Sequence, residues 1–97
     1  MKETPLVAFV FVQTQLHAAK TAENLAQIPE VEELHRVAGE DCYVVRVRVA
    51  NTGELDRVVR EIERIRSVHS TRTTLVLKTF KDKSELHRQR SSASSAV

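Results

Sequence analysis

The first predicted element is a strand near the start of the chain. Residues 6–15 are rich in β-branched and aromatic side chains, and both alternating sets of positions are apolar as far as Val12. Such a strand is typical of a sheet that is covered on both faces. Helices would cover one face. The other face must meet something else, and in so short a chain a second subunit is one candidate.

Two stretches have the spacing of amphipathic helices. The first covers 18–28 and ends before Pro29, because a proline disfavours helix at the residue that precedes it. The second follows Thr52, a suitable N-cap, and its apolar residues recur at helical intervals. These apolar residues are Leu55, Val58, Val59, Ile62 and Ile65. Opposite charges four residues apart lie on its outer surface, in the pairs Asp56/Arg60 and Arg57/Glu61.

Three further segments are predicted to be strands. Residues 31–38 mix apolar and polar positions, which indicates an edge strand. A turn at Gly39-Glu40-Asp41 then leads into residues 43–49, so the two segments form a hairpin. Residues 43–49 alternate, with one face made of Tyr43 and three valines. The last predicted strand covers 68–80, which is rich in threonine, leucine and valine.

The order β-α-β-β-α-β predicts an α+β fold of the ferredoxin-like type. Two right-handed β-α-β crossovers give a βαββαβ sandwich, with a four-stranded antiparallel sheet and two helices on one of its faces. From Lys81 the composition changes, and the end of the chain is charged and then Ser-rich. We therefore expect one domain over residues 1–83 and a disordered Ser-rich tail over residues 84–97.

Arg46 and Arg48 form a polar stripe on the second face of the 43–49 strand. One interpretation is a solvated or salt-bridged face. The other is a sheet face paired with another subunit, where the arginines meet Glu32, Glu33 or other carboxylates. Partners are needed in the second case because burying an unpaired charge is costly.

Composition narrows the function only slightly. The 97 residues allow one domain, and a net charge of +2 does not by itself imply binding to nucleic acid or membrane. The single cysteine, Cys42, cannot form an internal disulfide, so a reducing cytoplasm is expected. The longest apolar run, Leu6 to Val12, is far shorter than the ~20 residues of a membrane span. No secretion signal is predicted.

Several segments in the correct order resemble the effector-binding domain of the Lrp/AsnC family, the feast/famine transcriptional regulators. They are residues 28–31 (Ile-Pro-Glu-Val), residues 37–49, the Leu55-Asp56 pair and residues 68–78. The resemblance covers about residues 6–81. It implies a ferredoxin-like domain that dimerises by stacking sheets face to face, with dimers assembling into rings, often octamers. It also implies that amino acids or related small molecules bind between dimers.

The resemblance further assigns a ligand site to the turn between the second and third strands and to the start of the last strand. Carried over to this sequence, the ligand-binding residues are Gly39, Glu40, Asp41, Cys42, Thr71 and Thr73. The usual family turn is Gly-x-x-Asp, whereas here Cys42 occupies the position of the carboxylate and Asp41 lies one residue earlier. A shift of one residue on a strand changes the side chain's direction. The sequence therefore does not decide whether the Asp41 carboxylate points toward a ligand.

These residues suit an amino-acid zwitterion in chemical type. A glycine turn lets the backbone approach a ligand, Glu40 or Asp41 can accept from an ammonium group, and threonine hydroxyls can donate or accept. Thr71 and Thr73 are two apart on a strand, which puts both on one face. The plain alternatives are that the turn is only a turn and that the threonines are only good strand formers.

The first functional hypothesis is a module for small-molecule sensing and oligomerisation, without enzymatic activity or cofactor. Family members usually carry an N-terminal helix-turn-helix, whereas this chain begins at Met1 just before the first strand. It is thus expected to be a stand-alone or excised domain with no direct contact to nucleic acid. Control of transcription would then need a DNA-binding partner, such as a full-length Lrp/AsnC relative.

Two other functions fit the topology. One is a small dimeric enzyme of the monooxygenase or isomerase type, but no acid is paired with a base in the pattern. The other is an RNA-binding domain, which needs exposed aromatic residues on its central strands. Metal binding is not expected, because the histidines at 17, 35, 69 and 87 do not share ligand spacing. Cys42 is interpreted as a small hydrophobic residue.

Overall fold

The computed structural model describes residues 5–15, 19–39 and 43–82 of the chain. Its elements, in order, are β1 (Leu6–Thr14), α1 (Ala19–Ala26), β2 (Val31–Arg36), β3 (Tyr43–Val49), α2 (Thr52–Glu63) and β4 (Val68–Leu75). The predicted order of strands and helices is confirmed. None of the described helices is both long and apolar enough to cross a bilayer.

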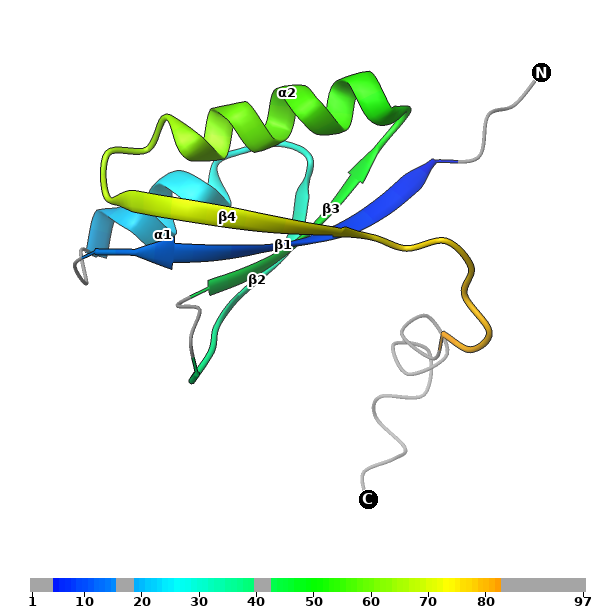
Figure 1. Ribbon diagram of the computed structural model, residues 1–97, viewed down its shortest axis with the longest axis horizontal. Helices are drawn as coiled ribbons and strands as arrows, with labels where there is room; N and C mark the ends of the chain where they lie inside the picture. The colour runs from blue at the N-terminus through cyan, green and yellow to red at the C-terminus, as the bar shows by residue number, and fades with distance from the viewer. Residues whose placement is uncertain (1–4, 16–18, 40–42, 83–97) are drawn as a thin grey trace.

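The four strands form one antiparallel sheet in the order β2-β3-β1-β4. Both helices lie on the same face of this sheet, and α2 runs across it with contacts to β1, β3 and β4 (Figure 1). The expected α+β sandwich of the ferredoxin-like type is therefore confirmed. Hairpin pairing of β2 with β3 is also confirmed, with β2 at the edge of the sheet.

The hydrophobic core lies between the helices and the sheet. Alternate residues of the two central strands point into it, so that Val10 of β1 lies opposite Val45 of β3, both fully buried. Leu25 of α1 and Ile62 of α2 close the core from the helical side. The buried residues are Ala8, Val10, Val12, Leu25, Ile28, Tyr43, Val45, Val47, Val49, Val58 and Ile62.

Helix α2 begins one residue earlier than the sequence suggested. Asn51, not Thr52, is the N-cap: its backbone is extended and its Oδ1 accepts a hydrogen bond from the backbone N–H of Glu54 at 2.9 Å. The prediction of Thr52 as the cap was wrong because both residues are good caps, and only backbone conformation separates them. Both expected ion pairs on the outer surface are present, Arg60–Asp56 at 3.0 Å and Arg57–Glu61 at 3.3 Å.

The cap gives a first prediction. Asn51→Ala should lower the free energy of unfolding by about 1 kcal/mol, because it leaves an N–H at the start of α2 without its acceptor. Urea denaturation followed by circular dichroism measures this loss. Thr52→Ala is the matched control and should change stability much less. Equal losses in the two variants would contradict the assignment of Asn51 as the cap.

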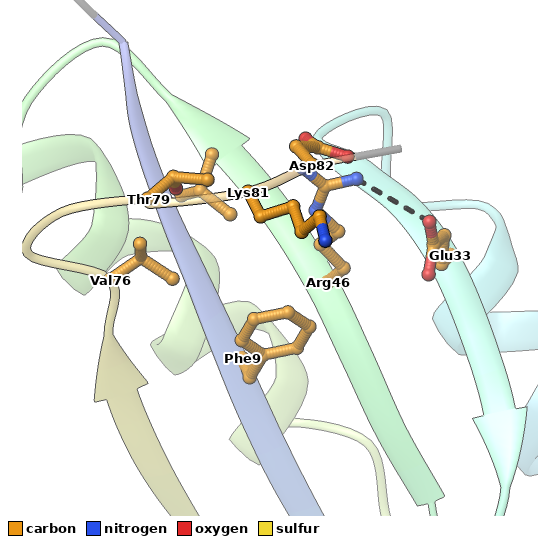
Figure 2. Close-up of a pocket in the computed structure, with 8 residues that line it drawn as sticks. Phe9, Glu33, Arg46, Val76, Thr79, Lys81 and Asp82 are labelled. Atoms are coloured by element: carbon orange, nitrogen blue, oxygen red, sulfur yellow. Dashed lines mark hydrogen bonds and ion pairs between the residues drawn. The ribbon is translucent and has the colours of Figure 1, made fainter. Parts of the chain in front are cut away.

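Strand β4 ends at Leu75, whereas the sequence predicted a strand as far as residue 80. Val76 still donates a backbone hydrogen bond to Val7 at 2.9 Å, but β1 begins at Leu6, so it offers no further ladder. The chain then leaves the edge of the sheet and crosses its helix-free side (Figures 1 and 2). We call residues 76–82 the strap. The predicted tail, residues 84–97, lies outside the described residues.

Candidate functional site

The face of the sheet opposite the helices is one candidate functional surface. The register puts Val7, Phe9 and Phe11 of β1 on this face, with Phe9 opposite Arg46 and Phe11 opposite Val44 of β3. All five side chains are only partly exposed. The Arg72 guanidinium from β4 lies over the Phe11 ring, 4.4 Å from its centroid. The face thus has an aromatic centre with arginines on either side.

Ion pairs within the chain hold the arginines of β3. Arg48 Nε donates to Glu32 Oε2 at 2.6 Å, and Arg46 Nη1 lies 3.4 Å from Glu33 Oε2 and 3.7 Å from Glu32 Oε1. The register shifts between Val31 and Glu33, so two consecutive carboxylates of β2 can face neighbouring arginines. The carboxylate partners of Arg46 and Arg48 on β2 belong to the same chain, so the stripe is salt-bridged within one copy.

These contacts stabilise the charged forms of Glu33 and Arg48 at this edge of the sheet. The hydrogen bond with His35 lowers the pKa of the Glu33 carboxyl, burial opposes this shift, and the charge of Arg46 lowers the pKa further. The bond to Glu32 raises the pKa of Arg48. Glu33 and His35 are largely exposed, and exposed pairs contribute little to stability. The main consequence of the ion pairs with Glu32 and Glu33 is to orient the Arg46 side chain.

A hollow of about 340 Å³ lies between the strap and the helix-free face. Figure 2 shows Thr79, Lys81 and Asp82 of the strap passing over the sheet, with Phe9 and Arg46 beneath them. Val7 and Val76 add to its apolar wall. The Asp82 Oδ2 atom lies 4.0 Å from Arg46 Nη2, so an ion pair joins the strap to β3.

The sequence did not predict this hollow. Residues 76–82 have no periodicity that shows where the strand ends, and their pattern of Val, Leu, Thr and Phe is compatible with continued pairing. The end of β4 could be inferred from the length of its partner strand β1, which starts only at Leu6. That inference is possible only once the register between β1 and β4 is known.

The structure describes only one of the four predicted ligand residues on the turn. Gly39 has a φ of +128°, a conformation that other residues rarely adopt, and no atom lies within 4 Å of where a Cβ would stand. The glycine is therefore required by the backbone rather than by crowding. Glu40, Asp41 and Cys42 lie outside the described residues.

Thr71 and Thr73 share one face of β4, as their spacing predicted. They pair with Val12 and Val10, which are buried under the helices, so this is the helix-covered side of the sheet. The Thr71 hydroxyl donates to Glu63 Oε2 of α2 at 2.9 Å, whereas Thr73 is exposed.

Within one copy, the turn and the threonines are apart. Thr71 lies in line with Tyr43, but β1 stands between their strands, which corresponds to roughly 10 Å across two strand spacings. The described residues of a single chain therefore do not unite Gly39 with Thr71 and Thr73 in one pocket. No group of three or more His, Cys, Asp or Glu side chains that could hold a metal is found among the described residues.

Comparison with known proteins identifies the family. The model of the Lrp/AsnC ligand binding domain matches residues 7–86. This chain belongs to the Lrp/AsnC family. The HTH-type transcriptional regulator FL11 of Pyrococcus horikoshii is 35% identical over 82 residues, which are 84% of this chain and 54% of the relative. The chain thus spans about half the length of the curated Lrp/AsnC relatives it matches.

Solved structures of similar proteins have the same architecture. A feast or famine regulatory protein of Mycobacterium tuberculosis, solved in complex with L-methionine, is 34% identical with a TM-score of 0.72 over 81% of this chain and 54% of that one. TTHA0845 of Thermus thermophilus is 29% identical with a TM-score of 0.74, and the match covers 79% of this chain and 99% of that one. The family resemblance read from the sequence is confirmed.

Proposed function

We propose that this chain senses a small molecule, an amino acid in the first instance, and transmits its binding through assembly to a transcriptional regulator. The match to the Lrp/AsnC ligand binding domain carries this proposal. Two further observations support it: relatives such as FL11 are named transcriptional regulators, and a related structure contains L-methionine. A full-length Lrp/AsnC relative is one proposed partner of this assembly, and the cytoplasm is its proposed location.

The assembly unit of this proposal is a homodimer formed through the helix-free face. Both described helices cover the same side of the sheet, and the other side carries Phe9 and Phe11 partly open to solvent. Burying such aromatic area is a main source of binding energy at protein interfaces. A second copy stacked on this face would cover both rings. Dimers then assemble into a higher oligomer, with an octamer-like ring as the form the family resemblance implies.

The effector site of the proposal is formed by Gly39, Glu40, Asp41 and Cys42 of one copy with Thr71 and Thr73 of another. Support comes from the separation of the two groups within a single chain, together with the exposure of Thr73. A carboxylate of the turn would accept from the effector's ammonium group, and backbone N–H groups would donate to its carboxylate.

The pKa shifts among the described residues have a structural cause. The groups with shifted pKa among the described residues are Glu33, Arg48 and Arg57, and each lies in an ion pair with a nearby side chain. Shifts of this kind stabilise charged forms. They do not prepare a general acid or base for proton transfer near neutral pH.

The effector site is tested by binding. Wild-type protein is titrated with a panel of L-amino acids by calorimetry, and its mass is followed by light scattering. Thr73→Val should weaken binding of the preferred amino acid by about threefold to tenfold, since one hydroxyl hydrogen bond is lost. Thr52→Val is the matched control, because Thr52 is exposed at the first residue of α2 and belongs neither to the proposed site nor to the helix-free face.

Three outcomes are informative. Weaker binding in Thr73→Val alone supports the site. Equal binding in both variants removes Thr73 from it. A wild-type protein that binds no amino acid, and whose mass no amino acid changes, overturns the sensing function itself.

A further inference from the structure

The two edges of the sheet differ in how well they are protected against a further strand. β2 and β4 are the outermost strands, and in the described part of the chain each pairs on one side only. β2 carries Glu32, Glu33 and Arg36, and its register is interrupted between Val31 and Glu33. Charged side chains and irregular pairing are features with which proteins block an edge strand. The edge of β2 is therefore protected.

The edge of β4 lacks these protections between Ser70 and Leu75. Its pairing with β1 is uninterrupted over this segment, which contains neither proline nor glycine. The one charged side chain in the segment, Arg72, lies over the Phe11 ring on the helix-free face and so does not project from the edge. An unprotected strand edge of this kind is a template for pairing with another strand.

One hydrogen bond shows which backbone groups of β4 point outward. The Val76 N–H donates to the Val7 carbonyl of β1 at 2.9 Å. Along an antiparallel strand, residues that bond to a given neighbour alternate with residues whose backbone groups face the other way. The even-numbered residues of β4 therefore bond to β1. The N–H and C=O groups of Thr71, Thr73 and Leu75 point away from the sheet.

We propose that this edge pairs with β4 of a second copy, antiparallel and with Thr73 opposite Thr73 of that copy. In this register Thr71 lies opposite Leu75. The outward N–H and C=O groups of all three residues are then paired. Two four-stranded sheets become one continuous antiparallel sheet across a two-fold axis.

The side chains of the edge suit a second copy in this register. On the helix-covered side, Thr73 meets its counterpart, and a pair of threonines stabilises neighbouring strands. On the helix-free side, Arg72 meets Thr74, so no like charges are opposed. A register centred on Thr71 would extend past Ser70 into the segment where the pairing with β1 is irregular. The register centred on Thr73 stays within the regular part of the strand.

This inference rests on the proposed assembly of dimers into a higher oligomer, and it identifies the surface that joins them. The edge lies at the side of the sheet, so stacking on the helix-free face does not use its outward backbone groups. A face-stacked dimer has two such edges, whereas a single copy has one. Each dimer in a closed ring is therefore held at both ends, and the two contacts reinforce each other.

The test uses proline, which removes one backbone N–H. Thr73→Pro removes the outward donor but no hydrogen bond to β1, and edge strands tolerate proline at such positions. Association between dimers should weaken by about a hundredfold, because each symmetric contact loses two hydrogen bonds and the two rings clash. Thr73→Val is the matched control: it changes the same side chain, keeps the N–H and should alter the association by less than about threefold. Light scattering across a dilution series measures both variants.

Disulfide formation tests the register. In a Cys42→Ser background, Thr73→Cys should form a covalent dimer on mild oxidation, because the Cα atoms of directly opposite residues lie about 5.5 Å apart, within disulfide range. Thr71→Cys is the control. Position 71 lies on the same side of β4, but in this register it is displaced by four residues, or about 14 Å, from its counterpart. It should therefore not crosslink.

The outcomes separate this inference from the proposed function. A higher oligomer that is lost in Thr73→Pro and kept in Thr73→Val supports the edge contact. Equal masses of wild-type protein and Thr73→Pro overturn it, as does crosslinking in Thr71→Cys instead of Thr73→Cys. Crosslinking gives this answer whether or not Thr73→Pro folds.

Two results with wild-type protein complete the test. A mass that stays at the dimer at every concentration overturns the edge contact and leaves the edge of β4 to a strand of another protein. Amino-acid binding by the same protein is measured separately by calorimetry. Binding without a higher oligomer keeps the sensing function and rejects the edge contact, whereas a higher oligomer that binds no amino acid and is lost in Thr73→Pro does the reverse.

Discussion

Phe11→Ala is expected to dissociate the proposed dimer into single copies at micromolar concentration. Phe11 lies at the centre of the helix-free face, opposite Val44 and beneath Arg72. A central aromatic side chain typically contributes about 2 kcal/mol or more to an interface. A two-fold symmetric interface contains each residue twice, so the loss doubles to about 4 kcal/mol, or roughly a thousandfold in the dissociation constant.

Light scattering across a dilution series measures this change. Phe11 is not part of the core, so the variant should keep its circular dichroism spectrum and melt cooperatively. Val59→Ala is the control: Val59 lies on α2, on the opposite side of the sheet, and its truncation should alter the dissociation constant far less. A dimer that survives Phe11→Ala, or one that Val59→Ala weakens equally, would show that the copies meet elsewhere.

The architecture could be predicted because its signals are local and periodic. Alternation in residues 43–49 placed Tyr43 and three valines on one face, and all four are buried. Helical spacing placed Val58 and Ile62 on the inner side of α2, and both are fully buried. When one side of a strand or helix is buried, apolar residues recur at every second, third or fourth position. This periodicity can be recognised without knowing which element packs against that side.

Features that depend on a partner strand could not be predicted in the same way. The end of β4 is set by where β1 begins, and the meeting of Glu32 and Glu33 with arginines depends on a shift of register in β2. Even the face on which Thr71 and Thr73 lie follows from their pairing with Val12 and Val10. The hollow is a consequence of the first of these. It exists because the strap leaves the sheet early and crosses it.

The candidate ligand residues also combine features that could be predicted from the local sequence with features that depend on strand pairing. The sequence correctly placed Gly39 in a turn, since only a glycine tolerates its φ of +128° without strain. It also placed Thr71 and Thr73 on one face. It did not show that a whole strand separates the two groups within one copy, nor that the Thr71 hydroxyl is already bonded to Glu63. This separation supports the proposal that the site takes residues from two chains, which would make assembly part of binding.

Stability of the single copy should depend above all on Ile62. Its side chain is fully buried where α2 packs on the sheet, and Ile62→Ala is expected to lower the free energy of unfolding by about 2–5 kcal/mol, through lost apolar burial and the cavity left behind. Val59→Ala on the same helix is the control. Val59 is only partly buried at the edge of the core, so its loss should be clearly smaller.

Urea denaturation at a fixed protein concentration gives both values. Helix α2 supports β4 directly, and Glu63, next to Ile62, accepts the hydrogen bond from Thr71. Effector binding by Ile62→Ala should therefore fall in step with its folded fraction and recover at low temperature or with added ligand. A loss of less than about 1 kcal/mol would mean that α2 contributes little to the core. The support of β4 would then have to come from its pairing with β1 alone.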